Sequence, residues 1–202
     1  MTQEALAAKL IRNKILKSSS IIQAFLNVDR ADFVLPHHKN IAYEDGPLSI
    51  GDDATISQPS TVAFMFELLQ SQAGQKILDI GSGSGWTTAM LADVILKKGR
   101  VIGTEISPIL VEFGRNNLSK YNYENVEIWQ ADKYLGAFDE APFDRILVSA
   151  TSTKIPEQLI TQLAPGGIMV LLVNQTIQKV EKISEDEIQI TEFPGFVFVP
   201  LK

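Results

Sequence analysis

The sequence contains no cysteine, which excludes disulfides, thiolate nucleophiles and metal sites built on cysteine. Histidine is nearly absent as well, because His37 and His38 are the only two in the chain. Adjacent side chains diverge from one another, and no carboxylate stands at a recognisable ligand spacing from this pair. We therefore interpret the two histidines as an exposed loop pair and expect no metal ion.

Long apolar runs and an excess of basic residues are also missing. The longest apolar run, Ile168–Val173, is far shorter than the roughly 20 residues that cross a bilayer, and the first residues lack the apolar centre of a signal peptide. The net charge of −6 gives no electrostatic footprint for nucleic acid or an anionic membrane. The 202 residues, 45% of them hydrophobic, predict one globular domain. We expect a cytoplasmic monomer that binds neither nucleic acid nor membrane.

The first part of the chain combines helical patterns with a long irregular segment. Apolar residues at helical spacing predict helices over residues 3–17 and 21–28, which we expect to cover one end of the core. Residues 29–58 are rich in turn-forming residues and predict a long loop, which in a compact domain is more often functional than idle. Pro59 then begins a helix that we expect to run to about Gln70.

Strands and helices alternate from Lys76 onward. Apolar runs predict strands over residues 77–80, 100–105, 126–131, 143–150 and 168–173, with helices over 86–96, 110–121 and 156–163. Strands separated by helices form βαβ units, so we predict an α/β fold with a doubly wound, mostly parallel sheet. After Asn174, the alternating segments 176–183 and 187–191 predict an antiparallel hairpin, and a last extended run covers 196–201.

A glycine-rich turn follows the first of these strands. The run Ile77–Ile80 ends in Gly81-Ser82-Gly83-Ser84-Gly85, and a helical pattern begins directly afterwards at Trp86. Glycines at the carboxyl end of a buried parallel strand allow a tight turn and the close approach of a ligand. The spacing G-x-G-x-G differs from the G-x-G-x-x-G of dinucleotide folds. The turn therefore indicates a nucleotide-like cofactor other than a dinucleotide, with a tight turn that binds nothing as the alternative.

Three acids stand at strand ends around this turn. Glu105 ends the second strand, where it is placed to accept hydrogen bonds from both ribose hydroxyls of a nucleoside. Its alternative role is to interact with the dipole of the following helix. Asp132, after the third strand, is placed to contact an adenine amino group or is a loop acid without that role. Asp79 is expected to orient the turn and to meet the amino group of the cofactor, and Ile106 is expected to stack on adenine.

These motifs carry a resemblance to known families. Asp79 with the glycine turn resembles motif I of the class I S-adenosylmethionine-dependent methyltransferases. A more specific resemblance covers nearly the whole chain: residues 41–70, with Thr55-Ile56-Ser57-Gln58-Pro59 inside them, resemble the signature of the protein-L-isoaspartate O-methyltransferase family. The match continues, in the family's order, through residues 79–86, 141–148, 155–167 and 198–201.

The resemblance implies a class I methyltransferase, Rossmann-like fold in a single domain, 1–202, with antiparallel strands at the C-terminal end of the sheet. Residues 1–60 would form a helical cap and substrate loop, and residues 61–202 the catalytic core. The implied reaction transfers the methyl group of S-adenosyl-L-methionine to the free α-carboxylate of isoaspartyl residues in damaged proteins or peptides, as a step of protein repair. No general base is required, because a carboxylate is already ionised at neutral pH.

The family match also implies roles for individual residues. Ser57 is the implied catalytic residue, which holds a carboxylate oxygen without taking a proton. Its alternative role is to cap the helix that starts near Pro59. The implied cofactor-binding residues are Thr55, Ile56, Ser57, Asp79, Gly81, Ser82, Gly83, Gly85, Glu105, Ile106, Asp132 and Lys133.

Three departures from the family pattern bear on the pocket. Ser60 stands where the family usually has an aromatic residue or histidine, Lys133 replaces a glycine, and Asn174-Gln175 shortens a glycine-rich loop. These changes leave two rivals open: a methyltransferase for another acceptor, such as a small molecule or an RNA, and a cofactor-binding protein without turnover. A nicotinamide dehydrogenase is disfavoured by the glycine spacing and by the antiparallel end of the sheet.

Overall fold

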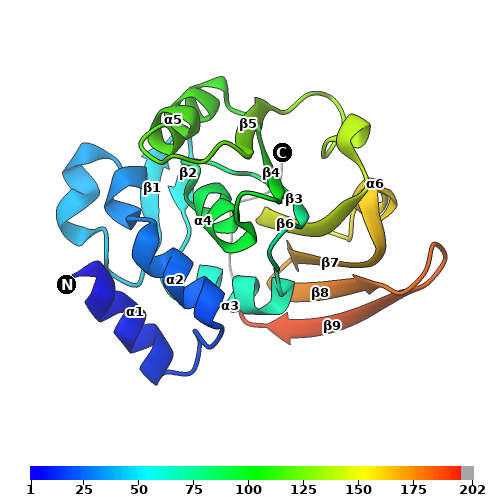
Figure 1. The fold of residues 1–202 in the computed structure, drawn as a ribbon, viewed down its shortest axis with the longest axis horizontal. Helices are drawn as coiled ribbons and strands as arrows, with labels where there is room; N and C mark the ends of the chain where they lie inside the picture. The colour runs from blue at the N-terminus through cyan, green and yellow to red at the C-terminus, as the bar shows by residue number, and fades with distance from the viewer. Residues whose placement is uncertain (197–202) are drawn as a thin grey trace.

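The large sheet of the protein has seven strands in the order β5-β4-β3-β6-β7-β8-β9 (Figure 1). The structure is a computed structural model and describes residues 1–196. The strands are β3 (Lys76–Ile80), β4 (Arg100–Glu105), β5 (Val126–Gln130), β6 (Phe143–Ser152), β7 (Leu163–Val173), β8 (Thr176–Lys182) and β9 (Ile188–Pro194). Neighbours from β5 to β7 pair in parallel, whereas β8 and β9 are antiparallel additions. The predicted fold class is confirmed.

Helices cover both faces of this sheet. They are α1 (Gln3–Arg12), α2 (Ser19–Asn27), α3 (Pro59–Leu69), α4 (Trp86–Ile95), α5 (Pro108–Leu118) and α6 (Glu157–Gln162), with short 3₁₀ helices at η1 (Arg30–Phe33), η2 (Pro36–Ile41) and η3 (Phe138–Glu140). A separate antiparallel pair, β1 (Leu48–Gly51) and β2 (Ala54–Ile56), precedes α3. Figure 1 shows α2 between α1 and α4, with the β8–β9 hairpin projecting at the opposite side of the molecule.

The two faces of the sheet pack into separate cores. Side chains alternate along a strand, and neighbouring Ile77 and Leu78 of β3, both fully buried, belong to different apolar clusters. The first cluster includes apolar residues of α1 to α5, whereas the second is covered by α6 and the chain before β6. The helical cap therefore belongs to the larger core.

Several element boundaries differ from the sequence-based prediction. The first helix ends at Arg12 because Asn13 caps it and Lys14 is left-handed, with φ of 58°. The segment 29–58 is not wholly irregular, since it contains η1, η2 and the β1–β2 pair. Residues 197–201 of the last predicted strand lie outside the described residues. In the described part of the chain, no helix is both long enough and apolar enough to cross a membrane.

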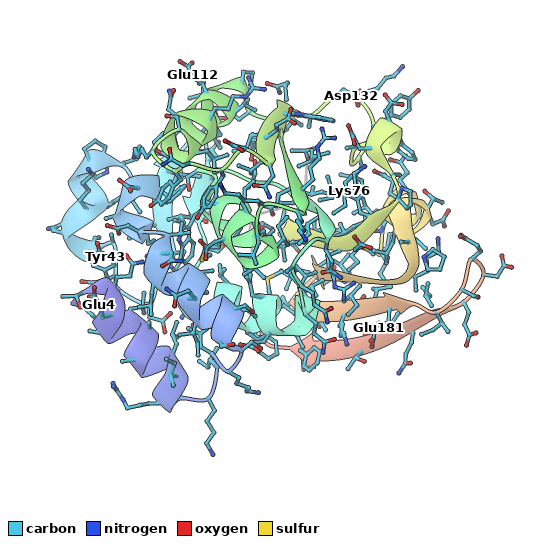
Figure 2. The ribbon with its side chains drawn as sticks, in the orientation of Figure 1. Glu4, Tyr43, Lys76, Glu112, Asp132 and Glu181 are labelled. Atoms are coloured by element: carbon cyan, nitrogen blue, oxygen red, sulfur yellow. The ribbon has the colours of Figure 1, made fainter. Side chains whose placement is uncertain are left out.

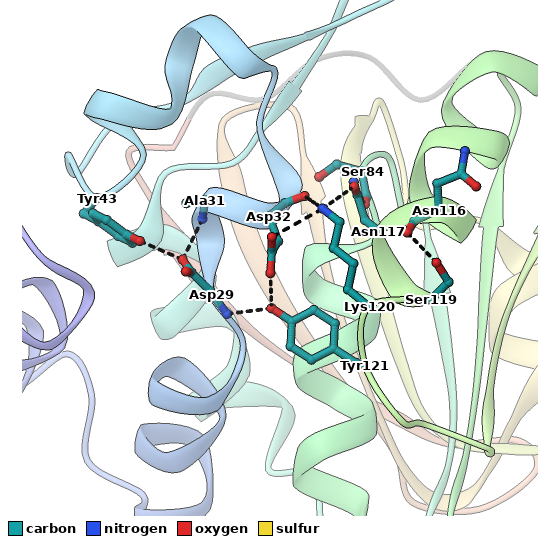
Figure 3. A network of polar contacts seen from close by, with 10 residues as sticks. All are labelled: Asp29, Ala31, Asp32, Tyr43, Ser84, Asn116, Asn117, Ser119, Lys120 and Tyr121. Atoms are coloured by element: carbon teal, nitrogen blue, oxygen red, sulfur yellow. Dashed lines mark hydrogen bonds and ion pairs between the residues drawn. The ribbon is translucent and has the colours of Figure 1, made fainter.

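A polar network joins the cap to the end of α5 (Figure 3). The Tyr121 hydroxyl accepts a hydrogen bond from the Asp29 backbone N–H at 2.9 Å and donates to Asp32 Oδ2 at 3.0 Å. Lys120 Nζ donates to the Asp32 carbonyl at 2.8 Å. Burial, followed by the hydrogen bond to Asp32, raises the pKa of Tyr121, which keeps its hydroxyl neutral. The segment that enters the loop is thereby fixed to the core of the fold.

Candidate active site

The site lies where the strand order reverses, at the carboxyl ends of the parallel strands. β3 has β4 on one side and β6 on the other, and in open α/β sheets such switch points hold ligands. A cavity of about 380 Å³ opens there, within the range of roughly 300–1,000 Å³ typical of small-molecule sites. Of the predicted cofactor residues, those that line it are Thr55, Gly81, Gly83, Glu105, Ile106, Asp132 and Lys133.

A second, smaller cavity of about 30 Å³ adjoins the first. Both are lined by Thr55, Gly81, Gly83 and Ser149, and the smaller one also by Ile56, Ser57, Ser82 and Trp86. The Ser82 hydroxyl and the Trp86 indole N–H are buried without a hydrogen-bond partner among residues 1–196. Because the positive end of the α4 dipole lies here as well, this donor-rich cavity suits an anionic oxygen such as that of a carboxylate.

Glu105 connects the glycine turn to the start of α5. Its Oε2 accepts a hydrogen bond from the Gly83 backbone N–H at 2.9 Å, and its Oε1 accepts one from the Ser107 N–H, also at 2.9 Å. Ser107 is the N-cap of α5, so Glu105 does meet the beginning of that helix. Each carboxylate oxygen can accept a second hydrogen bond, and Glu105 lines the cavity. The helix-end role and a role toward ribose are therefore compatible.

Gly85 has a packing position and lines neither cavity. It caps α4 with φ of 86°, and a Cβ there would lie 3.2 Å from the Gly114 carbonyl oxygen. A Cβ on Gly114 itself would lie 2.7 Å from Ile128 Cδ1 and 3.0 Å from the Gly83 carbonyl oxygen. These two glycines let α5 approach the turn closely, a pairing that no local sequence pattern reveals.

Asp79 is fully buried beneath the turn and lines neither cavity. Its Oδ2 accepts hydrogen bonds from the hydroxyls of Thr87 at 2.8 Å and Thr88 at 2.6 Å, whereas its Oδ1 has no partner among residues 1–196. Burial, together with the nearby charge of Glu105, raises the pKa of Asp79 to about 6. The site thus holds a buried carboxylate that a cation would stabilise.

Asp132 and Lys133 follow β5 on an exposed loop, where Figure 2 labels Asp132. Asp132 Oδ1 accepts a hydrogen bond from the Tyr134 N–H at 2.6 Å, which shapes the loop locally. The Lys133 ammonium lies 4.7 Å from the centre of the Tyr134 ring. The lysine that replaces the family's glycine is therefore drawn onto its neighbour by a cation–π contact.

Ser57 lies half-buried between β2 and α3. The N-cap of α3 is Gln58, without a side-chain hydrogen bond. Asp45 takes the capping role instead, since its Oδ1 accepts a hydrogen bond from the Ser60 N–H at 2.9 Å. The alternative in which Ser57 caps this helix is thus not what the structure shows, and Ser57 lines the small cavity.

Comparison with known proteins gives the family. The model of the family described as Protein-L-isoaspartate(D-aspartate) O-methyltransferase matches residues 1–202. A protein-L-isoaspartate O-methyltransferase of Thermococcus onnurineus is 42% identical over 96% of this chain and 90% of its own length. One from Methanopyrus kandleri is 41% identical over 98% of this chain and 90% of its own. The chain belongs to the protein-L-isoaspartate O-methyltransferase family.

A solved structure of this family has the same fold over the same length. The protein-L-isoaspartate O-methyltransferase of Plasmodium falciparum, crystallised with S-adenosyl-L-homocysteine, superposes with a TM-score of 0.89. The superposition covers 100% of this chain and 99% of that chain, at 26% identity. Family resemblance at the level of Thr55–Pro59 therefore extends to the arrangement of the whole domain.

Sequence reasoning missed the residues that support this family's site from a distance. Arg30 and Asp45 contact the Ser57 and Ser60 backbone, respectively, although neither belongs to a recognisable motif. Ser149 of β6 and Gln158 of α6 also line the large cavity. The predicted loop pair lies in η2, with His37 exposed and His38 half-buried.

Proposed function

We propose that this protein transfers the methyl group of S-adenosyl-L-methionine to the free α-carboxylate of isoaspartyl residues in damaged proteins and peptides. The observation that carries the proposal is the position of Ser57, the residue of the family's specific motif. It lies at a donor-rich cavity that adjoins the larger cavity at the strand ends. Action as a cytoplasmic monomer, without nucleic acid, belongs to the same proposal.

The residues present fit the methyl donor. Glu105 retains acceptor capacity for the ribose hydroxyls, and Ile106 and Asp132 line the cavity where adenine would lie. Asp79, whose Oδ1 has no partner in the described part of the chain, suits the positively charged amino group of the donor. When bound, S-adenosyl-L-methionine supplies an electrophilic methyl group on a sulfonium centre.

The role of the chain in catalysis is to align the acceptor. The Ser57 hydroxyl donates a hydrogen bond to one oxygen of the acceptor carboxylate, which directs the other oxygen toward the donor site. No proton has to be removed, because the acceptor is ionised at neutral pH. Acceleration then comes from orientation and from the exclusion of water by the walls of the site.

The three departures from the family pattern leave the cavities open. The Ser60 N–H is bound by Asp45, and the Lys133 ammonium lies over Tyr134. Asn174 forms the tight β7–β8 turn with φ of 54°, and its carbonyl accepts a hydrogen bond from the Thr151 hydroxyl at 2.8 Å. We therefore propose that this member is active and not only a cofactor-binding protein.

The test offers the enzyme an isoaspartyl peptide, its normal aspartyl twin and S-adenosyl-L-methionine labelled in the methyl group. We expect label in the isoaspartyl peptide alone, because only this peptide has the free α-carboxylate of an isoaspartyl residue. The label should be released by mild base, which hydrolyses a carboxyl methyl ester. Absence of that label refutes the proposal. A faster reaction with a small molecule or RNA would then support the first rival, and tight S-adenosyl-L-homocysteine binding without turnover would support the second.

A further inference from the structure

Arg30 is a buried cation beside the candidate active site. Its side chain is 1% exposed, and burial lowers its pKa to about 10, with the nearby charge of Asp45 opposing that effect. Burial of a charge costs several kcal/mol unless hydrogen bonds compensate it. An apolar residue would fill such a space without this desolvation cost, so the contacts of the guanidinium need an explanation.

The guanidinium holds two distant parts of the loop together. Nη1 donates to the carbonyls of Ala42 at 2.5 Å and Glu44 at 3.3 Å. Nη2 donates to the carbonyls of Gly46 and Ser57, both at 3.0 Å. One side chain therefore fastens residues 42–46 to the backbone of Ser57, and it does so with the planar fork that lysine lacks.

The same guanidinium also contacts the cofactor side of the site. Its Cζ lies 5.2 Å from the centre of the Trp86 ring. Trp86 is the first residue of α4, directly after the glycine turn, and lines the small cavity together with Ser57. Arg30 thus bridges the backbone of Ser57 and the first side chain beyond the glycine turn.

We propose that Arg30 is a positioning residue for methyl transfer, which fixes the Ser57 backbone so that the hydroxyl faces the small cavity. This inference rests on the proposed function and deepens it. The Ser57 side chain has a single rotatable bond to its hydroxyl oxygen, so once its backbone is fixed that oxygen is restricted to three staggered positions. Displacement of an aligned group by about 1 Å can cost on the order of 100-fold in rate.

A double-mutant cycle with Ser57 tests this coupling. We expect Arg30→Lys to lower kcat on an isoaspartyl peptide roughly 10- to 100-fold when Ser57 is present. In the Ser57→Ala background the same change should lower kcat less than about 2-fold, because the group that Arg30 positions is gone. Equal losses in both backgrounds would overturn the proposal, since a general structural defect acts whether or not Ser57 is present.

A second buried arginine provides the matched control. Arg145 on β6 is 8% exposed and donates to the carbonyls of Asp144 at 2.7 Å and Gln70 at 3.4 Å. It lines neither cavity of the site. Arg145→Lys should leave kcat within about 2-fold of wild type, and a loss as large as that of Arg30→Lys would overturn the specific role of Arg30.

Hydrogen exchange of the apo protein gives a readout that does not depend on activity. Arg30→Lys should accelerate amide exchange in residues 42–58 and leave β3 unchanged, because the hydrogen bonds of the guanidinium go to carbonyls between residues 42 and 57. Unchanged exchange in 42–58, or faster exchange throughout, would overturn the proposal. If the wild-type enzyme failed to methylate the peptide, the proposed function would fail, and this comparison would still decide whether Arg30 holds the loop.

Discussion

Replacement of Asp79 by asparagine separates two effects of this residue. One is its effect on the free energy of unfolding, and the other is its contribution to the affinity for the cofactor. The side chain is fully buried, two hydroxyls donate to Oδ2, and Oδ1 is unpartnered within residues 1–196. An asparagine side chain would keep the shape and one acceptor oxygen but carry no charge. We expect the substitution to abolish tight cofactor binding without destabilising the apo protein at neutral pH.

The effect on stability follows from the raised pKa. Burial raises the pKa of Asp79 from 3.8 to about 6, so the folded protein binds the proton more tightly than the unfolded chain. The stability that this protonation provides is present below pH 4 and is lost as the pH rises through about 6. The full loss is about 3 kcal/mol, at 1.36 kcal/mol for each pKa unit. Asp79→Asn removes this pH dependence. The variant's free energy of unfolding should therefore exceed that of wild type by about 1 kcal/mol less at pH 5 than at pH 7.5.

The effect on binding has the opposite sign. To pair with the Asp79 carboxylate, the bound amino group would have to reach it beneath the turn, and loss of one partner of such a buried charge pair costs about 2–5 kcal/mol. The dissociation constant for S-adenosyl-L-homocysteine should rise by roughly 30-fold or more at pH 7.5. Wild-type affinity should weaken as the pH falls below about 6, because Asp79 becomes protonated. The affinity of the asparagine variant should lack this dependence.

Two assays on the same samples of wild type and Asp79→Asn measure the stability and the cofactor affinity. Urea unfolding of the apo proteins at pH 5 and pH 7.5 gives the stability difference, and isothermal calorimetry over the same range gives the affinities. A variant that unfolds more easily than wild type at pH 7.5 yet binds S-adenosyl-L-homocysteine within about 3-fold of it would refute the reasoning. Asp79 would then be a structural partner of Thr87 and Thr88.

Three further substitutions test other parts of the site. Gly83→Val should abolish S-adenosyl-L-homocysteine binding in calorimetry, because Gly83 has φ of 52° and a Cβ there would lie 3.1 Å from Ile50 Cδ1. Gly166→Val is the control for backbone strain, since Gly166 has φ of 77° and open space around it. This control variant should bind normally. Ser57→Ala should lower turnover of the isoaspartyl peptide roughly 10- to 100-fold, the value of a hydrogen bond to a charged group, with cofactor affinity nearly unchanged; full activity would contradict its catalytic role. Gly114→Ala should destabilise the fold by about 1–3 kcal/mol in urea unfolding, because its Cβ would lie 2.7 Å from Ile128 Cδ1; an unchanged midpoint would show that α5 moves freely.

The parts of the fold that the sequence predicts are those with local causes. The apolar run Ile77–Ile80 and the glycines after it specify a buried strand and a tight turn within a short stretch of chain, and the structure confirms the strand with its parallel neighbours. The β8–β9 hairpin was predictable for the same reason, since strict alternation and a polar turn lie close together. Element ends were less accurate, because the cap at Asn13 and the left-handed Lys14 carry no strong sequence signal.

Site residues could be predicted from the sequence only where they belong to one contiguous motif. The motif resemblance indicated Ser57 and the turn, but the partners that hold them come from far along the chain. Arg30 donates to the Ser57 carbonyl across 27 residues, and Asp45 caps α3 across 15. Gly85 belongs to the motif, and the structure places it against Gly114 of α5, a packing contact that the motif alone does not indicate.

These distant contacts imply that the cap sets the distance between donor and acceptor sites. On one side, Arg30 bridges the Ser57 carbonyl and the Trp86 ring. On the other side, Asn117 Nδ2 donates to the Ser84 carbonyl at 3.0 Å, while its Oδ1 accepts from Lys120, which also binds Asp32 (Figure 3). The carboxyl end of the glycine turn is therefore contacted by Arg30 of the cap and by Asn117, whose partner Lys120 also binds the cap. Because methyl transfer depends on alignment, changes in either connection should affect turnover more than they affect the binding of the cofactor alone.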